Sequence, residues 1–342
     1  MTQTCLIDGL SRNRRLDTVV ARSLTQAETQ APASIDPVEV APGVFFLEGG
    51  TRYFRAETEQ GPQGSIRSLM CNNGWVVLGD EVLLVDANMP GRADVLLDAI
   101  RNTTDKPVRY LFNTHHHGDH VYGNGAIFQR TGCTITACIG MVEELRRYET
   151  GTFGGSPGRK EQVAKFRPDV AATELMLPDM LFERSLVFEG GGRRAELLHL
   201  GWGHTRGDAV LWLPRERVLF AGDLVTNGAY NIVRDAEMMP WISTLADLRA
   251  LDPLSVCPGH GPMGQLALID DQLAFFLALL RQVEKRIAAG LTREALLADL
   301  EDIRGALLAE PQAAEHVIPR QADLSVLSLQ AQVERIYEQV HG

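Results

Sequence analysis

The segment Asn113-Thr114-His115-His116-His117-Gly118-Asp119-His120 contains four of the nine histidines of this 342-residue chain. It follows Tyr110-Leu111-Phe112, a predicted β-strand, and it precedes a predicted helix. Side chains that bind or react concentrate in such loops, because a rigid scaffold positions them. Imidazole nitrogens and carboxylate oxygens are ligands for zinc and related divalent ions. The segment therefore indicates a metal site at the end of a strand.

The spacing within this segment divides its side chains between two positions. Alternate residues of extended backbone point to the same side. His115 and His117 are therefore expected to face one ion, while His116 faces away. Asp119 and His120 then turn toward a second position.

Three further polar residues lie in glycine-rich turns that each follow a predicted strand. Glycine at such a turn allows the backbone to approach an ion closely. The three turns are Gly201-Trp202-Gly203-His204-Thr205, Phe220-Ala221-Gly222-Asp223 and Cys257-Pro258-Gly259-His260-Gly261.

Taken in order, these motifs resemble the metallo-β-lactamase superfamily over roughly residues 40–262. The resemblance implies an α+β fold, an αββα sandwich with a dinuclear metal site along one edge. It also implies a first ion bound by three histidines, a second ion bound by one aspartate and two histidines, and one aspartate that bridges both. The residues implied for the first ion are His115, His117 and His204. Those implied for the second ion are Asp119, His120 and His260, and the implied bridging aspartate is Asp223.

The resemblance assigns secondary roles to other residues as well. Asp86, which ends a predicted strand, matches a supporting aspartate that orients metal ligands. His116 occupies a variable position, facing solvent or supporting the ligands. The remaining histidines match nothing in the motif and are interpreted as ordinary; they are His199, His316 and His341.

The chain length gives a soft expectation of about two domains. We predict an N-terminal arm at residues 1–37, a metallo-β-lactamase-like domain at 38–264, and a C-terminal helical extension at 265–342. Within the domain, two similar blocks of short strands are each followed by a helix and a further strand. In the second block, the strands include residues 218–220 and 255–257, and the helix covers about 243–251.

Two regions leave alternatives open. Residues 149–178 interrupt the pattern with a glycine-rich loop, which is either a lid or an inert insertion. The C-terminal extension carries two apolar stripes at helical spacing, which pack either against their own chain or against a second copy in a homodimer.

Composition argues against several classes of protein. The net charge of −11 disfavours nucleic acid as a partner, because phosphate backbones are repelled. No apolar run reaches the roughly 18 residues of a membrane helix, and no signal peptide is visible. Five sparse cysteines are typical of reduced thiols. We therefore expect a cytoplasmic protein that acts on a small molecule.

The expected reaction is hydrolysis. Two divalent ions a few ångströms apart lower the pKa of a bridging water, and the resulting hydroxide attacks an electrophilic centre. Zinc is the favoured metal, with iron or manganese compatible with a bridging carboxylate. Asp119 is the predicted catalytic residue, which orients the nucleophile and carries its proton to the leaving group.

The bridging position bears on the substrate. True β-lactamases of the superfamily usually place cysteine there or lack a bridge, whereas Asp223 resembles thioesterases, lactonases and nucleases. We predict cleavage of an ester, lactone or thioester, with a β-lactam hydrolase or a phosphodiesterase as alternatives. A metal-binding protein without turnover is the alternative from another class, although seven ligands for two ions leave room for water.

The sequence matches the features of the lactonase branch and of the glutathione-thioester branch only in part. The tyrosine that lactonases often carry three residues after the bridge is replaced by Thr226, with Tyr230 further on. Basic residues that could hold a glutathione thioester are present in the extension, but they fit a solvated helix face equally well. Candidate apolar walls of the substrate pocket are Phe153, Trp202 and Trp241.

Overall fold

A computed structural model describes residues 36–49, 52–58, 61–68, 70–149, 158–165, 167–227, 231–317 and 325–341. Nearly all of the predicted N-terminal arm lies outside these ranges. So do the pocket candidate Phe153 and the tyrosine at position 230.

The first sheet has seven strands in the order β1-β2-β5-β6-β7-β8-β9. Its first four strands are antiparallel, and β6 to β9 run parallel. A separate two-stranded pair is formed by β3 and β4. The bounds are β1 Val38–Ala41, β2 Val44–Leu47, β3 Arg52–Thr58, β4 Gly61–Ser68, β5 Asn73–Leu78, β6 Glu81–Val85, β7 Val108–Phe112, β8 Thr134–Cys138 and β9 Met180–Phe182.

The second sheet has five strands in sequence order, β10 to β14. Its first four strands are antiparallel, and β13 and β14 pair in parallel. The bounds are β10 Ser185–Gly190, β11 Arg193–Leu198, β12 Val210–Leu213, β13 Val218–Thr226 and β14 Ser255–His260.

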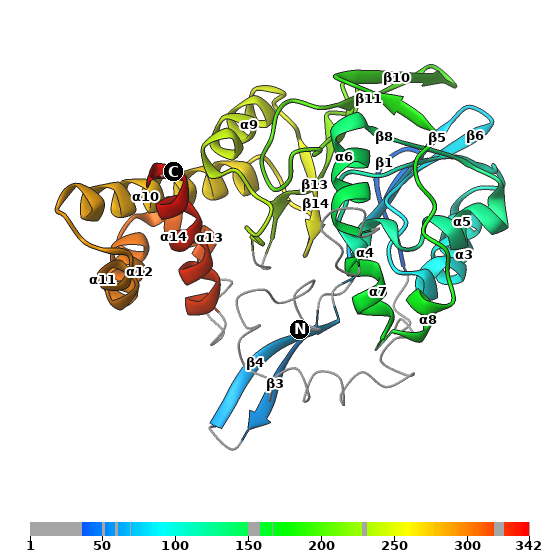
Figure 1. Cartoon of the computed structure of the whole chain (residues 1–342). Helices are drawn as coiled ribbons and strands as arrows, with labels where there is room; N and C mark the ends of the chain where they lie inside the picture. Colours follow the sequence, from blue (N-terminus) through cyan, green and yellow to red (C-terminus); the bar gives the residue numbers. More distant parts are fainter. Residues whose placement is uncertain are drawn as a thin grey trace.

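Helices cover the outer face of each sheet, while Met141 of α6, Val163 of α7 and Val170 of α8 pack against the core between the sheets. Figure 1 shows α3 and α5 beside the first sheet and α9 with the C-terminal helices beside the second. The bounds are η2 Pro90–Arg92, α3 Ala93–Thr103, α4 Gly118–Val121, α5 Asn124–Thr131, α6 Ile139–Glu144, η3 Leu145–Glu149, α7 Arg159–Ala164, α8 Pro168–Ala171, α9 Met238–Ala250, α10 Ala267–Ala288, α11 Arg293–Ala298, α12 Leu300–Leu308, α13 Pro311–Val317 and α14 Ser325–His341.

Strand alternation produces the layers. On β6, Leu83 and Val85 pack in the core between the sheets, while Val82 and Leu84 pack in the outer core with α3. On β13, Phe220 faces the central core, and Leu219 faces the core beneath α9 and α10. Apolar side chains are therefore buried on both faces of the central strands of each sheet, while alternate residues of the edge strand β10 are exposed, and the predicted αββα sandwich is confirmed.

Two boundaries in the second block differ from the prediction. Helix α9 begins at Met238 and not near residue 243, because Pro240 lies in the first turn, where its missing N–H leaves no bond unmade. Strand β13 continues to Thr226 and not only to residue 220. Asp223 consequently lies within the strand, beside a register irregularity, and not after its end.

Residues 149–178 are also more structured than a loop. The described part of this segment contains α7 and α8, and Arg159 and Arg167 each form an ion pair there. The prediction that residues 149–178 form a loop was therefore wrong for the residues of these two helices. Whether the segment opens as a lid stays a prediction.

The apolar stripes of the C-terminal extension pack against their own chain. Ile269, Phe276 and Val283 of α10 and Val333 of α14 share one buried core with α9 and β13. The predicted domain boundary at residue 264 precedes α10 by two residues. A homodimer through these helices stays a prediction that sedimentation can test.

The four cysteines within the described ranges are free and buried, at positions 71, 133, 138 and 257. Burial raises the pKa of the Cys71 thiol to about 12 and also raises that of Cys257. These thiols are protonated and unreactive at neutral pH.

Among the helices of the described ranges, none combines the length and the apolar character that a membrane span requires.

Candidate metal centre

The seven side chains expected to bind metal lie together at one edge of the sandwich. In each sheet, parallel strands end together at this edge. The loop after β7, which runs parallel to β6, and the end of β14, which runs parallel to β13, therefore both supply side chains to the site. None of the seven is more than 7% exposed: His115, His117, Asp119, His120, His204, Asp223 and His260.

The first group combines His115, His117, His204 and Asp223, whose potential ligand atoms lie within 4.8 Å of one another. His204 comes from the loop between β11 and β12, and its Nε2 faces His117 Nδ1 at 2.9 Å. Three imidazoles and a carboxylate at this spacing suit a tetrahedral divalent ion.

The second group combines Asp119, His120 and His260, again within 4.8 Å. The first two belong to the short helix α4, and His260 is the last residue of β14. His260 Nε2 lies 3.2 Å from Asp119 Oδ2.

Asp223 stands between the two groups. Its Oδ1 lies 3.3 Å from His120 Nε2, and its Oδ2 lies 3.4 Å from His260 Nε2. Toward the first group, Oδ2 lies 3.5 Å from His204 Nε2 and 3.9 Å from His115 Nε2. One carboxylate therefore reaches both groups.

Several buried atoms of the centre fit a metal better than a hydrogen-bond network. Within the described ranges, His115 Nε2, His120 Nε2 and Asp119 Oδ2 have no hydrogen-bond partner. Buried polar atoms are normally paired, and an ion that accepts their lone pairs resolves the exception. The residues present therefore fit two divalent ions.

Two glycines allow the strands to approach this closely. A Cβ on Gly259 would lie 1.9 Å from Asp223 Oδ1, so any side chain there displaces the shared carboxylate. Gly222 has φ +52°, and a Cβ there would meet Thr114 at 2.8 Å.

Burial governs the protonation of the first group. It lowers the pKa of His204 to about 4 and holds those of His115 and His117 well below their usual value. Neutral imidazole is the form that binds metal. These three histidines are therefore ready to bind at neutral pH.

The second group is dominated by its carboxylates. Burial disfavours the charged form of His260, yet Asp223 and Asp119 outweigh it and raise the pKa to about 9. Burial likewise opposes ionisation of Asp223, but His260 and His120 hold its pKa well below the usual range. Metal binding at this group displaces protons, because an ion and a proton compete for the same nitrogen.

Asp86 supports the second group from behind, as the resemblance implied. Its Oδ2 lies 2.8 Å from His120 Nδ1 and accepts a bond from Thr114 Oγ1, while its Oδ1 accepts from the Thr114 N–H. Asp86 has φ +59°, an uncommon backbone conformation that here aims the carboxylate at the ligand loop.

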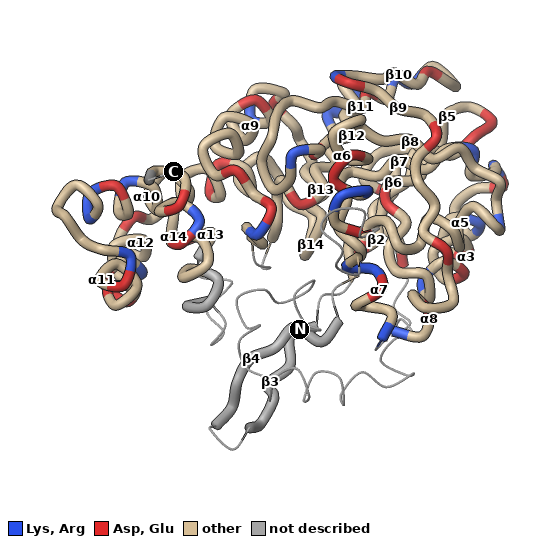
Figure 2. The backbone as a smooth tube through the Cα atoms, viewed as in Figure 1, with Lys and Arg blue, Asp and Glu red and all other residues tan. Residues whose placement is uncertain are grey.

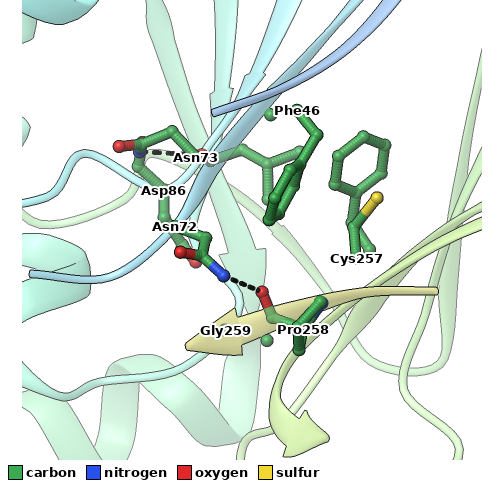
Figure 3. A pocket seen from close by; sticks show the side chains of 11 residues that line it. Phe46, Asn72, Asn73, Asp86, Cys257, Pro258 and Gly259 are labelled. Atoms are coloured by element: carbon green, nitrogen blue, oxygen red, sulfur yellow. Dashed lines mark hydrogen bonds between the residues drawn. The ribbon is translucent and has the colours of Figure 1, made fainter. Parts of the chain in front are cut away.

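A small pocket lies behind Asp86, between the two sheets (Figure 3). Phe46 and Cys257 line its apolar side. On the polar side, Asn73 Nδ2 donates to the Asp86 carbonyl, and Asn72 Nδ2 donates to the Pro258 carbonyl. The Asn72 hydrogen bond ties the start of β5 to the backbone just before His260, and the Asn73 hydrogen bond links β5 to the residue that follows β6.

The sequence did not single out Asp235. Its Oδ2 lies 3.0 Å from His117 Nε2 and 3.7 Å from His116 Nε2. His116 is fully buried, so the solvent alternative for it was wrong and the supporting role agrees with its position. Asp235 lies 118 residues from His117 and carries no motif, so no sequence signal marks this contact.

Asp208 was also missed. It is buried and accepts hydrogen bonds from the N–H and hydroxyl of Thr205, next to His204. Burial raises the pKa of Asp208 to about 7. Its place four residues after His204, in a polar turn, is the one local signal that could have indicated it.

Of the remaining tryptophans and histidines that the sequence analysis named, some are buried in the core and others lie at the surface. Trp241 is fully buried, packs against His204 and donates to the Leu224 carbonyl, so it supports the site from within the core. Trp202 is 43% exposed, with the Arg206 guanidinium over its ring. His316 is buried against Asn231.

The profile described as the metallo-beta-lactamase superfamily matches residues 67–260, which include all seven clustered side chains. The chain belongs to the metallo-beta-lactamase superfamily. The predicted family and fold are therefore confirmed, and the chain is a hydrolase of this superfamily with clusters that could hold metal ions.

Relatives from two branches of the superfamily resemble the chain. A "metallo-beta-lactamase type 2" of Bacteroides fragilis is 27% identical over 207 residues, which are 58% of this chain and 72% of the relative. A "hydroxyacylglutathione hydrolase" of Methylococcus capsulatus is 29% identical over 143 residues, 42% of this chain and 43% of the relative. The chain thus spans under half the length of the second relative.

A solved metallo-beta-lactamase from Pontibacter korlensis superposes with a TM-score of 0.53 at 21% identity. The match covers 71% of this chain and 99% of that chain. At this identity the likeness shows the superfamily fold.

Proposed function

We propose that the chain is a dinuclear-metal hydrolase that cleaves an ester-like bond, in an ester, lactone or thioester, of a small molecule. His115, His117 and His204 would hold the first ion, and Asp119, His120 and His260 the second. Asp223 would bridge them. Zinc suits this donor set best, and iron or manganese is compatible with it.

The observation that carries the proposal is the position of Asp223. Its two carboxylate oxygens lie 3.3–3.9 Å from histidines of both groups. A bridging carboxylate favours two ions held together, as in the thioesterase and lactonase branches. The hydroxyacylglutathione hydrolase relative supports the same branch.

When bound, two divalent ions supply Lewis-acid polarisation and an ionised water at neutral pH. The chain's own residues position the reaction. Asp119 Oδ2 lies 3.2 Å from His260 Nε2, within the second group, where the carboxylate could accept a proton and release it to the leaving group. The ligand side chains are at most 7% exposed, so water screens the electrostatic contacts among them little.

β-Lactam hydrolysis is the second candidate, because the Bacteroides fragilis relative carries that name and 72% of its length is matched. The bridging Asp223 argues against it as the main activity. A phosphodiesterase is less favoured still. Lys and Arg alternate with acidic residues along the described chain and form no continuous basic stripe (Figure 2).

A proton-release assay tests the proposal. Purified protein is assayed after metal loading and after chelator stripping, against an acyl-homoserine lactone, a glutathione thioester, an aryl ester, a β-lactam and a phosphodiester. We expect chelator-sensitive turnover of a lactone, thioester or ester. Turnover of only the β-lactam or only the phosphodiester would replace the proposal with that alternative, and a metal-loaded protein inert toward all five would overturn it.

A further inference from the structure

We propose that Asp235 is a positioning residue for the first ion, held in place jointly by Arg159 of α7 and by the C-terminal helix α14. The inference rests on the proposed function, because it names how this chain aims one ligand of that centre.

The contact with His117 determines which ring nitrogen is available. His117 Nε2 lies 3.0 Å from Asp235 Oδ2, and the opposite nitrogen, Nδ1, faces His204 Nε2 at 2.9 Å. A proton on Nε2 is donated to the carboxylate, so the lone pair of Nδ1 points toward the first group. A hydrogen bond of this kind fixes both the tautomer and the ring orientation of a metal-binding histidine.

Arg159 fixes the carboxylate from the other side. Its two terminal nitrogens donate to the two oxygens of Asp235, at 2.9 and 3.0 Å. Such a bidentate pair restricts the orientation of the carboxylate as well as its position. Asp235 and Arg159 are only 5% and 13% exposed, so water screens the pair little.

Arg159 is itself held over an aromatic ring. Its guanidinium carbon lies 4.4 Å from the centroid of Tyr148, at the end of η3, and the same ring stacks on His116 at 5.7 Å. Arg159 of α7 therefore reaches the ligand loop by two routes. One passes through the Tyr148 ring to His116, and the other passes through Asp235 to His117.

The C-terminal extension holds the backbone that carries Asp235. Arg335 Nε and Gln339 Nε2, both on α14, donate to the carbonyl of Ala236 at 2.8 and 3.1 Å. Gln339 Oε1 also accepts the N–H of Met238 at 3.0 Å. The residue next to Asp235 is therefore fixed by a helix about one hundred residues further along the chain.

Metal affinity of the isolated groups tests the inference without any substrate. In a His260→Ala background only the first group is complete, and in a His204→Ala background only the second. Zinc affinity of each protein is measured by competition with a chromogenic chelator, with and without Asp235→Ala.

We expect Asp235→Ala to weaken zinc binding about 10- to 100-fold in the first background and to leave it within about twofold in the second. The visible spectrum of bound cobalt should change in the first background as well. Asp169→Ala is the matched control, because it removes another Arg–Asp pair, with Arg167, that touches no histidine.

Variants of the supporting residues complete the test. Two further variants are the double substitution Arg335→Ala with Gln339→Ala, and the single substitution Arg159→Lys. Each should reduce the zinc affinity of the first group by less than Asp235→Ala does. Asp235→Asn keeps an oxygen for His117 and loses the charge that pairs with Arg159, so a fall of about three- to tenfold is expected. If Asp235→Ala fails to fold, the zinc affinity of Asp235→Asn tests the role of Asp235 instead.

Unchanged first-group affinity and cobalt spectrum in the Asp235 variants would overturn the inference, as would an equal loss in both backgrounds. A wild-type chain that binds two ions and hydrolyses no substrate overturns the proposed function instead, and the affinity differences still decide the role of Asp235.

Discussion

The two groups of the metal centre are built in different ways. In the second, Asp119 and His120 are neighbours on α4, and the supporting Asp86 directly follows β6, which pairs with the strand β7 that leads into their loop. In the first, His117 meets His204 from 87 residues away and Asp235 from 118 residues away. The first group is rich in neutral imidazole, and the second is rich in carboxylate. In the second group only His260, the last residue of β14, comes from a distant segment, whereas in the first group both His204 and the supporting Asp235 reach His117 from distant segments.

Asp223→Ala should have the largest effect, because Asp223 is the carboxylate that contacts both halves. We expect kcat/KM to fall by about a thousandfold or more. Metal analysis of the purified variant should show less than two ions per chain. Full occupancy by two ions would contradict the bridging role.

Asp119→Asn tests proton transfer separately from metal binding in the second group, because asparagine keeps an oxygen that can bind metal and loses the ionisable carboxyl group. Turnover should fall about 10²- to 10⁴-fold, because Asp119 Oδ2 no longer accepts a proton. His116→Ala should reduce turnover less, since His116 contacts Asp235 and not the reacting atoms. Rates are compared at saturating substrate and full metal loading, and wild-type turnover by the Asp119 variant would refute the assignment.

Asp86→Ala is the counterpart of Asp235→Ala. Zinc binding by the second group should weaken about 10- to 100-fold, because His120 Nδ1 loses the carboxylate that orients it. First-group affinity should stay within about twofold. Chelator competition in the same two single-group backgrounds checks this, and crossed effects would show that the halves are not independent.

Glu149→Gln provides the smallest expected change in activity, less than about twofold, since Glu149 contacts Tyr122 and lies 3.9 Å from Arg159 but touches none of the metal ligands. Burial raises the pKa of Glu149 from 4.5 to about 7. The folded state therefore binds more protons than the unfolded state between these values, so the wild-type free energy of unfolding falls as pH rises from about 4.5 to 7.

The Gln variant should lose this slope, and its stability relative to wild type should rise with pH by up to about 3 kcal/mol. Urea denaturation at pH 5 and pH 7.5 measures the difference. An equal difference at both pH values would show that Glu149 does not titrate in this window.

The position of the site could be predicted because its motifs are local. Four histidines within six residues, and the glycines beside His204, Asp223 and His260, are visible without any fold. The apolar stripe of α10 and the alternation in β6 follow from helical and strand periodicity. The start of α9 could not be placed, because Pro240 in a first turn resembles a helix break in the sequence.

Sequence motifs therefore predicted the residue types of the centre and the layered fold, because these depend on patterns within a few positions, whereas the division of the ligands between two ions was implied only by the family resemblance and stays a prediction. Tertiary structure alone decided which carboxylate orients His117, how deeply His116 is buried and what holds Asp235. Those contacts join segments about one hundred residues apart, and no periodicity or motif links such segments until the two sheets and the C-terminal helices pack together.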